Sequence, residues 1–185
     1  VFERTFNTVE EVLYHCTVHS TPGRDIATSM NGRLNVIEAE PAFQINPAVS
    51  DAWFNPLTGG QGFFIIVWQD IQTIFLAWFT YDTERPPESV EAILGEPGHR
   101  WLTAQGPYNG DTATLSVTLT RGGAFDSPQP AVDNVIDYGS YTLEALGCDS
   151  ILLTYDLPAI PRQRTIQLER VVKDNVAVCE ALNGQ

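Results

Sequence analysis

From Trp53 onward, short apolar runs alternate with turn residues such as Asn55-Pro56, Gly59-Gly60 and Gly122-Gly123. Dipeptides of this kind mark turns between strands. The runs are short, rich in β-branched and aromatic residues, and typical of half-buried strands. They predict strands at Gly62–Gln69, Thr73–Tyr81, Arg100–Gln105, Ala113–Arg121, Asp137–Leu146, Ile151–Asp156 and Thr165–Val172.

The short connections between these strands favour an antiparallel meander, which can close into a barrel or pack as a sandwich. We expect the barrel. One segment, Pro87–Leu94, is compatible with a short helix. Residues 52–172 are therefore predicted to form an antiparallel β-barrel-like domain, followed by a C-terminal tail at 173–185.

The first forty residues follow a simpler pattern. Glu11–Val18 and Arg33–Ala39 are predicted strands, joined by a loop that contains Pro22 and Gly23. Residues 41–51 contain two prolines and no clear periodicity, as is typical of a linker. The predicted fold is thus mainly β, with a strand-loop-strand unit at 1–40, a linker at 41–51 and the larger β domain after it.

Charge, hydrophobicity and the absence of catalytic motifs exclude or disfavour several classes of function. The chain has 185 residues, with 23 acidic and 10 basic side chains and a net charge of −13. Nucleic-acid binding needs a basic face to displace counterions, so we exclude it. The longest apolar run, Gly62–Trp68, is too short to cross a bilayer, so we expect no membrane insertion. Catalysis has little support because no nucleophile-elbow or zinc-helix motif occurs and His99 has no catalytic neighbours in the sequence.

The stretch Tyr14-His15-Cys16-Thr17-Val18-His19 is followed by Met30-Asn31-Gly32 and an apolar strand. It resembles the C-terminal copper-binding signature of cupredoxins, the blue-copper electron carriers. The resemblance implies that Cys16, His19 and Met30 bind copper, and thiolate, imidazole and thioether donors suit that metal. The family's second histidine has no counterpart in this chain. We expect that ligand from another part of a longer protein or from another chain.

The cupredoxin resemblance also implies the state of the three cysteines. Copper binding requires a free thiolate at Cys16, which leaves Cys148 and Cys179 to form a disulfide that ties the C-terminal tail. The function that it implies is electron transfer or copper handling, with a redox partner.

Residues 53 to about 170 resemble a second family, of uncharacterised β domains in exported bacterial proteins. The shared motifs are Trp53-Phe54-Asn55-Pro56, Gly60-Gln61-Gly62-Phe63, Trp78-Phe79-Thr80-Tyr81-Asp82, Trp101-Leu102-Thr103-Ala104-Gln105-Gly106, Gly122-Gly123-Ala124-Phe125, Cys148, Tyr155 and Leu168-Glu169-Arg170. This resemblance implies no activity. Both resemblances imply a secreted, periplasmic or cell-surface protein whose targeting segment has been removed.

The aromatic residues of the larger domain have two interpretations. Trp53, Trp78 and Trp101 form an aromatic core, or they form an exposed platform with Asn55 and Asp82 that stacks on a sugar or holds a peptide. Three functions therefore stay open. The first is a copper-binding electron carrier with an appended binding or structural module. The second is a structural or adhesive subunit that pairs strands with neighbouring copies while its copper site is empty, and the third is a carbohydrate-binding module.

Overall fold

The computed structural model describes residues 8, 10–15, 31–36, 43–161 and 163–184. The chain divides into two compact units, Val1–Pro41 and Ala42–Gln185. In the first unit, β1 (Glu10–His15) pairs antiparallel with β2 (Asn31–Val36), and both lie where the sequence predicts strands. The predicted copper ligands Cys16, His19 and Met30 lie outside the described residues.

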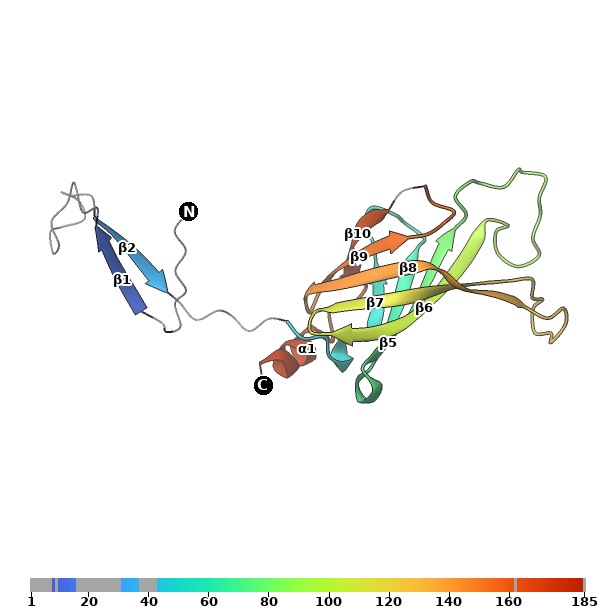
Figure 1. Cartoon of the computed structure of the whole chain (residues 1–185). Coiled ribbons are helices and arrows are strands. Elements are labelled where there is room, and N and C mark those ends of the chain that lie inside the picture. Colours follow the sequence, from blue (N-terminus) through green and yellow to red (C-terminus); the bar gives the residue numbers. More distant parts are fainter. Residues whose placement is uncertain (1–7, 9, 16–30, 37–42, 162, 185) are drawn as a thin grey trace. The chain divides into compact units, whose positions relative to one another are not determined.

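In the described part of the second unit, strands β3 to β10 form a closed antiparallel barrel (Figure 1). Each strand pairs with its neighbours along the chain, and β10 returns to pair with β3. The predicted antiparallel meander barrel is confirmed. The strands are β3 (Asp51–Phe54), β4 (Gly62–Trp68), β5 (Thr73–Tyr81), β6 (His99–Asn109), β7 (Thr112–Arg121), β8 (Asp133–Gly147), β9 (Ser150–Asp156) and β10 (Arg164–Arg170).

Strict alternation along the strands fills the interior of the barrel. In β4, Phe63, Ile65 and Val67 are buried, while the residues between them are exposed. Successive side chains of a strand point to opposite faces of the sheet, so each strand supplies every second residue to the core. The same alternation buries Leu115 and Val117 of β7.

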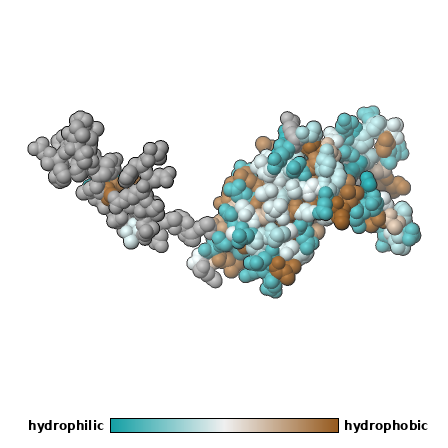
Figure 2. Space-filling view, viewed as in Figure 1, coloured by the Kyte–Doolittle hydropathy of each residue, from teal (hydrophilic) through white to brown (hydrophobic). Residues whose placement is uncertain are grey.

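The two ends of the barrel differ in their connections. Short turns at 69–72, 110–111 and 148–149 join strands at one end, which we call the closed end. The longer connections at 55–61, 82–98 and 122–132, together with the β9–β10 connection, lie at the other, which we call the open end (Figure 1). Figure 2 shows brown, hydrophobic surface at the open end.

The short helix expected at Pro87–Leu94 does not form, and the whole 82–98 connection is irregular. Its apolar residues Val90, Ile93 and Leu94 are all exposed. A helix this short depends on an apolar face packed against the protein, and here no such face is buried.

Residues 43–50 differ from the predicted linker because they are packed into the closed end. Ile45, Asn46 and Val49 are buried. Asn46 caps the 3₁₀ helix η1 (Pro47–Val49), its side chain accepting a 3.1 Å hydrogen bond from the Ala48 N–H. Pro47, one of the two prolines that suggested a linker, therefore belongs to a capped turn at the closed end.

The tail expected at 173–185 contains an unpredicted helix, α1 (Val176–Asn183). The predicted disulfide between Cys148 and Cys179 is confirmed and attaches this helix to the β8–β9 turn. The Asn46 side chain also donates to the Cys179 carbonyl at 3.4 Å. The tail is thus part of the closed end.

Arg170 is the central polar residue of the closed end, and its side chain is fully buried. Its guanidinium forms a 2.5 Å ion pair with Asp51 and donates to the carbonyls of Ala48 and Cys148. It also lies 4.6 Å over the ring of Trp53. One side chain therefore joins β3, η1, β10 and the β8–β9 turn.

Candidate functional site: the mouth of the barrel

A cavity of about 360 Å³ opens into the barrel at its open end, and we call it the mouth cavity. Its walls are formed by Leu102, Leu119, Leu157 and Ile160. Ligand pockets in proteins span about 300–1,000 Å³ and are lined mainly by apolar and aromatic side chains. The mouth cavity has the size and lining of a small-molecule site.

Four aromatic rings form a cluster at the inner end of the mouth cavity, which we call the aromatic floor: Phe63, Trp78, Tyr141 and Tyr155. Trp78 stacks on Phe63 with ring centroids 4.9 Å apart and meets Tyr141 edge-on at 5.9 Å. Its ring is tilted against that of Tyr155 at 5.5 Å. Trp78 and Tyr155 line the cavity directly, and Tyr141 is fully buried behind them. The floor is thus a close-packed platform centred on Trp78.

A β-bulge brings one further ring to the cavity. The pairing of β7 with β8 shifts register between Val117 and Leu119, and Asp137 opposite the shift has a positive φ of 53°. Bulges redirect side chains, and here Tyr138 lines the mouth cavity although simple alternation from Tyr141 would place it outside. Ser116 holds the bulge by donating a 2.6 Å hydrogen bond to the Asp137 carboxylate.

The rim of the cavity is polar and its charges are paired. Asp82 forms a 2.8 Å ion pair with Arg100, which also donates to the carbonyls of Pro97 and His99. Thr80 donates a 2.6 Å hydrogen bond to the Gln61 side chain. Arg100 therefore fastens the 82–98 connection to β6, and its charge is balanced by that of Asp82.

Two polar atoms of the aromatic floor have no hydrogen-bond partner among the described residues: Trp78 Nε1 and Tyr141 Oη. A buried polar group without a partner costs about 1–3 kcal/mol, and native proteins contain few of them. Burial raises the pKa of the Tyr141 phenol far above its ordinary value, and the nearby Tyr155 raises that pKa further. Tyr141 is therefore neutral at physiological pH.

The five predicted ligand-binding residues do not form one site. Trp78 and Asp82 line the mouth cavity. Trp53 is fully buried under Arg170, and Asn55 lies in the β3–β4 connection, where its side chain accepts from the Leu57 N–H at 2.9 Å. Trp101 is on the outer surface of β6 and is 53% exposed.

Three tyrosines of the site, Tyr138, Tyr141 and Tyr155, were not predicted as ligand-binding residues. A usable signal exists for the last two, since each falls in step with the buried residues of its strand, as in Tyr141-x-Leu143 and Ile151-x-Leu153-x-Tyr155. No such signal exists for Tyr138, because the bulge interrupts the alternation.

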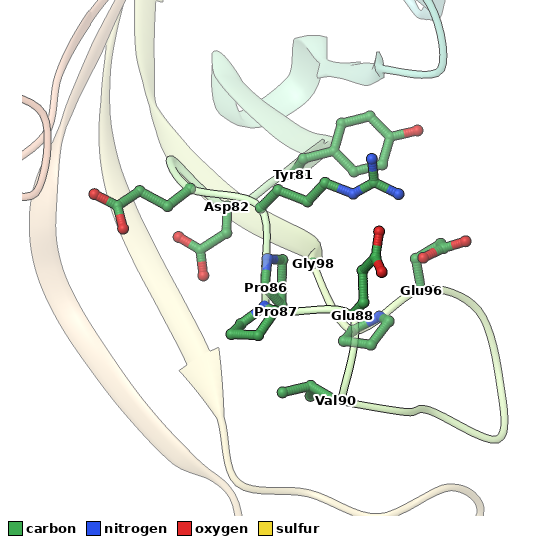
Figure 3. A pocket seen from close by; sticks show the side chains of 11 residues that line it. Tyr81, Asp82, Pro86, Pro87, Glu88, Val90, Glu96 and Gly98 are labelled. Atoms are coloured by element: carbon green, nitrogen blue, oxygen red, sulfur yellow. The ribbon is translucent and has the colours of Figure 1, made fainter.

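Two other hollows lie at the surface of the open end. One, of about 670 Å³, lies under the 82–98 connection, and Figure 3 shows the carboxylates of Glu88 and Glu96 on the side of the loop that faces Tyr81. The other, also of about 670 Å³, lies beside the exposed rings of Trp101 and Phe125. Neither suggests a metal centre, because the described residues contain no cluster of three or more His, Cys, Asp and Glu side chains placed to hold an ion.

None of the helices in the described part of the chain has the length and apolar character needed to cross a bilayer.

Comparison with known proteins found no match: no family model, no curated protein and no solved structure matches this chain. Its function is therefore argued from its own residues and their geometry.

Proposed function

We propose that the barrel unit is a non-catalytic binding module that holds a small, mainly apolar molecule in the mouth cavity. The observation that carries the proposal is a mainly apolar cavity of about 360 Å³, which is lined by Trp78 and Tyr155 of the aromatic floor. Eight-stranded barrels have an interior just wide enough to be filled by side chains or to hold one small ligand. In this barrel side chains fill the closed end and the cavity occupies the open end.

Packing energetics support a binding role for the cavity. Protein interiors are packed as densely as organic crystals, and empty volume forfeits dispersion contacts. At the closed end Trp53, Leu168 and Cys179 are fully buried. The same chain leaves a wide apolar cavity at the end that bears its long loops, which is where binding residues usually lie on a rigid scaffold.

A neutral fluorescent probe tests the proposal. Phenylnaphthylamine brightens in apolar sites, so its emission should rise and saturate on titration with the protein. Ala159 is a small, exposed residue of the cavity wall. The substitution Ala159→Trp should therefore fill the cavity without disturbing the core, and probe binding should be lost.

The matched control is Ala131→Trp, at an exposed alanine of the 122–132 connection that does not line the mouth cavity. This variant should bind the probe like the unmodified protein. Absence of saturable binding by the unmodified protein, or equal binding by Ala159→Trp, would reject the proposal.

We also propose copper binding by the first unit, through Cys16, His19 and Met30. The supporting observation is the Cys148–Cys179 disulfide, because it uses two of the three cysteines and leaves Cys16 as the remaining thiol of the chain. Thiolate, imidazole and thioether together form the donor set of electron-transfer copper sites. The function of this unit would then be copper handling or electron transfer.

Titration with Cu²⁺ tests the copper proposal, since a copper–thiolate bond absorbs visible light strongly. The absorption should appear with the unmodified protein and be lost in Cys16→Ser. His99→Ala, which alters a histidine of the barrel unit, should keep it. A protein that stays colourless at a stoichiometric excess of Cu²⁺ would exclude a blue-copper site in this chain.

A further inference from the structure

We infer that the ligand of the mouth cavity is an uncharged molecule with a hydrogen-bond acceptor at its buried end, and that Trp78 Nε1–H is the donor for that acceptor. This inference rests on the proposed binding function and specifies the class of ligand. It follows from the charges at the rim and from the unpaired polar atoms of the floor.

The paired charges at the rim of the cavity favour an uncharged ligand. Of the described residues that line the cavity, Asp82 and Arg100 are the charged ones, and they pair with each other at 2.8 Å. Arg100 also donates hydrogen bonds to the Pro97 and His99 carbonyls. A ligand carboxylate would have to displace these hydrogen bonds, which hold the 82–98 connection. A charged group in an apolar cavity needs a partner, and the net charge of −13 further disfavours anions.

The unpaired polar atoms of the aromatic floor favour a ligand that carries a hydrogen-bond acceptor. The indole N–H can only donate a hydrogen bond, and Trp78 Nε1 is buried without a partner among the described residues while its ring lines the cavity. The Tyr141 hydroxyl has the same unpaired status and belongs to a ring that contacts Trp78 edge-on. A carbonyl oxygen has two lone pairs, so one ligand oxygen could accept from both groups.

Both atoms have almost no area open to solvent, and Tyr141 does not line the cavity itself. The ligand must therefore shift one ring of the floor to reach them. Tyr155 is the candidate, because it lines the cavity and its ring is tilted, not stacked, against Trp78. Binding should accordingly change the NMR signals of Trp78 and Tyr155 together.

The test uses three matched probes: acetophenone, which carries a carbonyl, isopropenylbenzene, in which CH₂ replaces that oxygen, and benzoate, which is anionic. Satisfying a buried donor should make acetophenone bind about 10-fold more tightly than isopropenylbenzene. The Trp78 indole proton should move downfield with acetophenone only. Benzoate should bind more weakly than either neutral probe.

Trp78→Phe keeps a ring in the floor and removes the donor. In this variant the preference for acetophenone should fall, whatever the change in overall affinity, and adding Tyr141→Phe should make the two neutral probes bind equally. The NMR shift in the unmodified protein provides a second readout if the variant does not fold.

Equal binding of the two neutral probes to the unmodified protein, or tighter binding of benzoate, would overturn the inference while leaving a binding module. Failure of both neutral probes and of phenylnaphthylamine would instead reject the proposed function, and the inference with it.

Discussion

Trp53 and Trp78 face the interior of the same barrel, yet they differ in the hydrogen bonding of the indole N–H and in the packing around the ring. The Trp53 N–H donates to the Val49 carbonyl at 3.1 Å, and its ring lies under the paired guanidinium of Arg170. The Trp78 N–H has no partner among the described residues, and its ring borders a cavity. One tryptophan has all of its interactions supplied by the protein, while the other lacks a hydrogen bond.

The contrast extends to the two ends of the barrel. At the closed end an ion pair, a disulfide and a capped 3₁₀ helix converge on one packed layer. At the open end the strands lead into long connections around a cavity. Proteins tend to place unsatisfied or strained groups at functional sites and to compensate for them with stability elsewhere. We therefore assign stability to the closed end and binding to the open end.

The largest expected effect is that of Arg170→Met at the closed end. Removing this cation leaves Asp51, whose side chain is 15% exposed, without its ionic partner, and leaves two carbonyls without a donor. Breaking a buried pair in this way costs about 3–5 kcal/mol. Denaturant unfolding should show the loss. Arg121→Met is the control, because the Arg121–Asp133 pair is exposed and such pairs contribute at most about 1 kcal/mol.

Replacing both Cys148 and Cys179 by serine should have the next largest effect. The disulfide spans 31 residues of chain. In the chain-entropy model, closing a loop of this length contributes about 3–4 kcal/mol. The free energy of unfolding should fall by that amount while phenylnaphthylamine binding is unchanged. Loss of probe binding in a variant that is still folded would contradict the separation of the two ends.

Alternation and turn signals were sufficient to predict the barrel. The strands from β4 to β10 all overlap predicted ranges, because each combines an apolar inner face with a clear turn at its ends. The short strand β3 was not predicted as a strand. It has four residues, and such a segment carries too few positions to establish a period of two.

The closed end and the site were harder to predict because both depend on contacts that no local pattern shows. The pairing of Arg170 with Asp51 joins residues 119 positions apart, and no local pattern indicates it. The mouth cavity depends on the bulge at Asp137, which turns Tyr138 inward against the alternation. Trp78 was identified as a candidate from its aromatic character, but the sequence offers no way to distinguish its unpaired N–H from the paired one of Trp53.

A smaller effect should separate the two tryptophans directly. Trp53→Phe leaves the Val49 carbonyl without a donor and puts a smaller ring under Arg170, whereas Trp78→Phe removes an N–H that has no partner among the described residues. Both substitutions remove the same atoms, so the difference between them reflects their surroundings, which are a packed core with a paired N–H at Trp53 and a cavity wall at Trp78. We expect Trp53→Phe to be the more destabilising by about 2 kcal/mol in denaturant unfolding. Equal losses would mean that the Trp78 N–H has a partner in solution.

The smallest predicted effect appears only at high pH and concerns Tyr141. Its pKa is raised by burial and by Tyr155, so above pH 10 the unfolded chain releases the phenol proton while the folded barrel retains it. The unfolded state then binds fewer protons, and the stability that Tyr141 contributes below pH 10 should decline by about 1.4 kcal/mol per pH unit above it.

Tyr141→Phe should remove this decline. At neutral pH the substitution should cost little, because it deletes a hydroxyl that has no partner among the described residues. Tyr108, whose pKa is also raised by burial, adds a similar slope to both proteins, so the comparison between them cancels it. Unfolding curves that stay parallel between pH 9 and 11 would show that Tyr141 ionises as readily in the barrel as in the unfolded chain. The floor of the cavity would then be wet, and an acceptor-bearing ligand would have to displace water instead of meeting two unpaired groups.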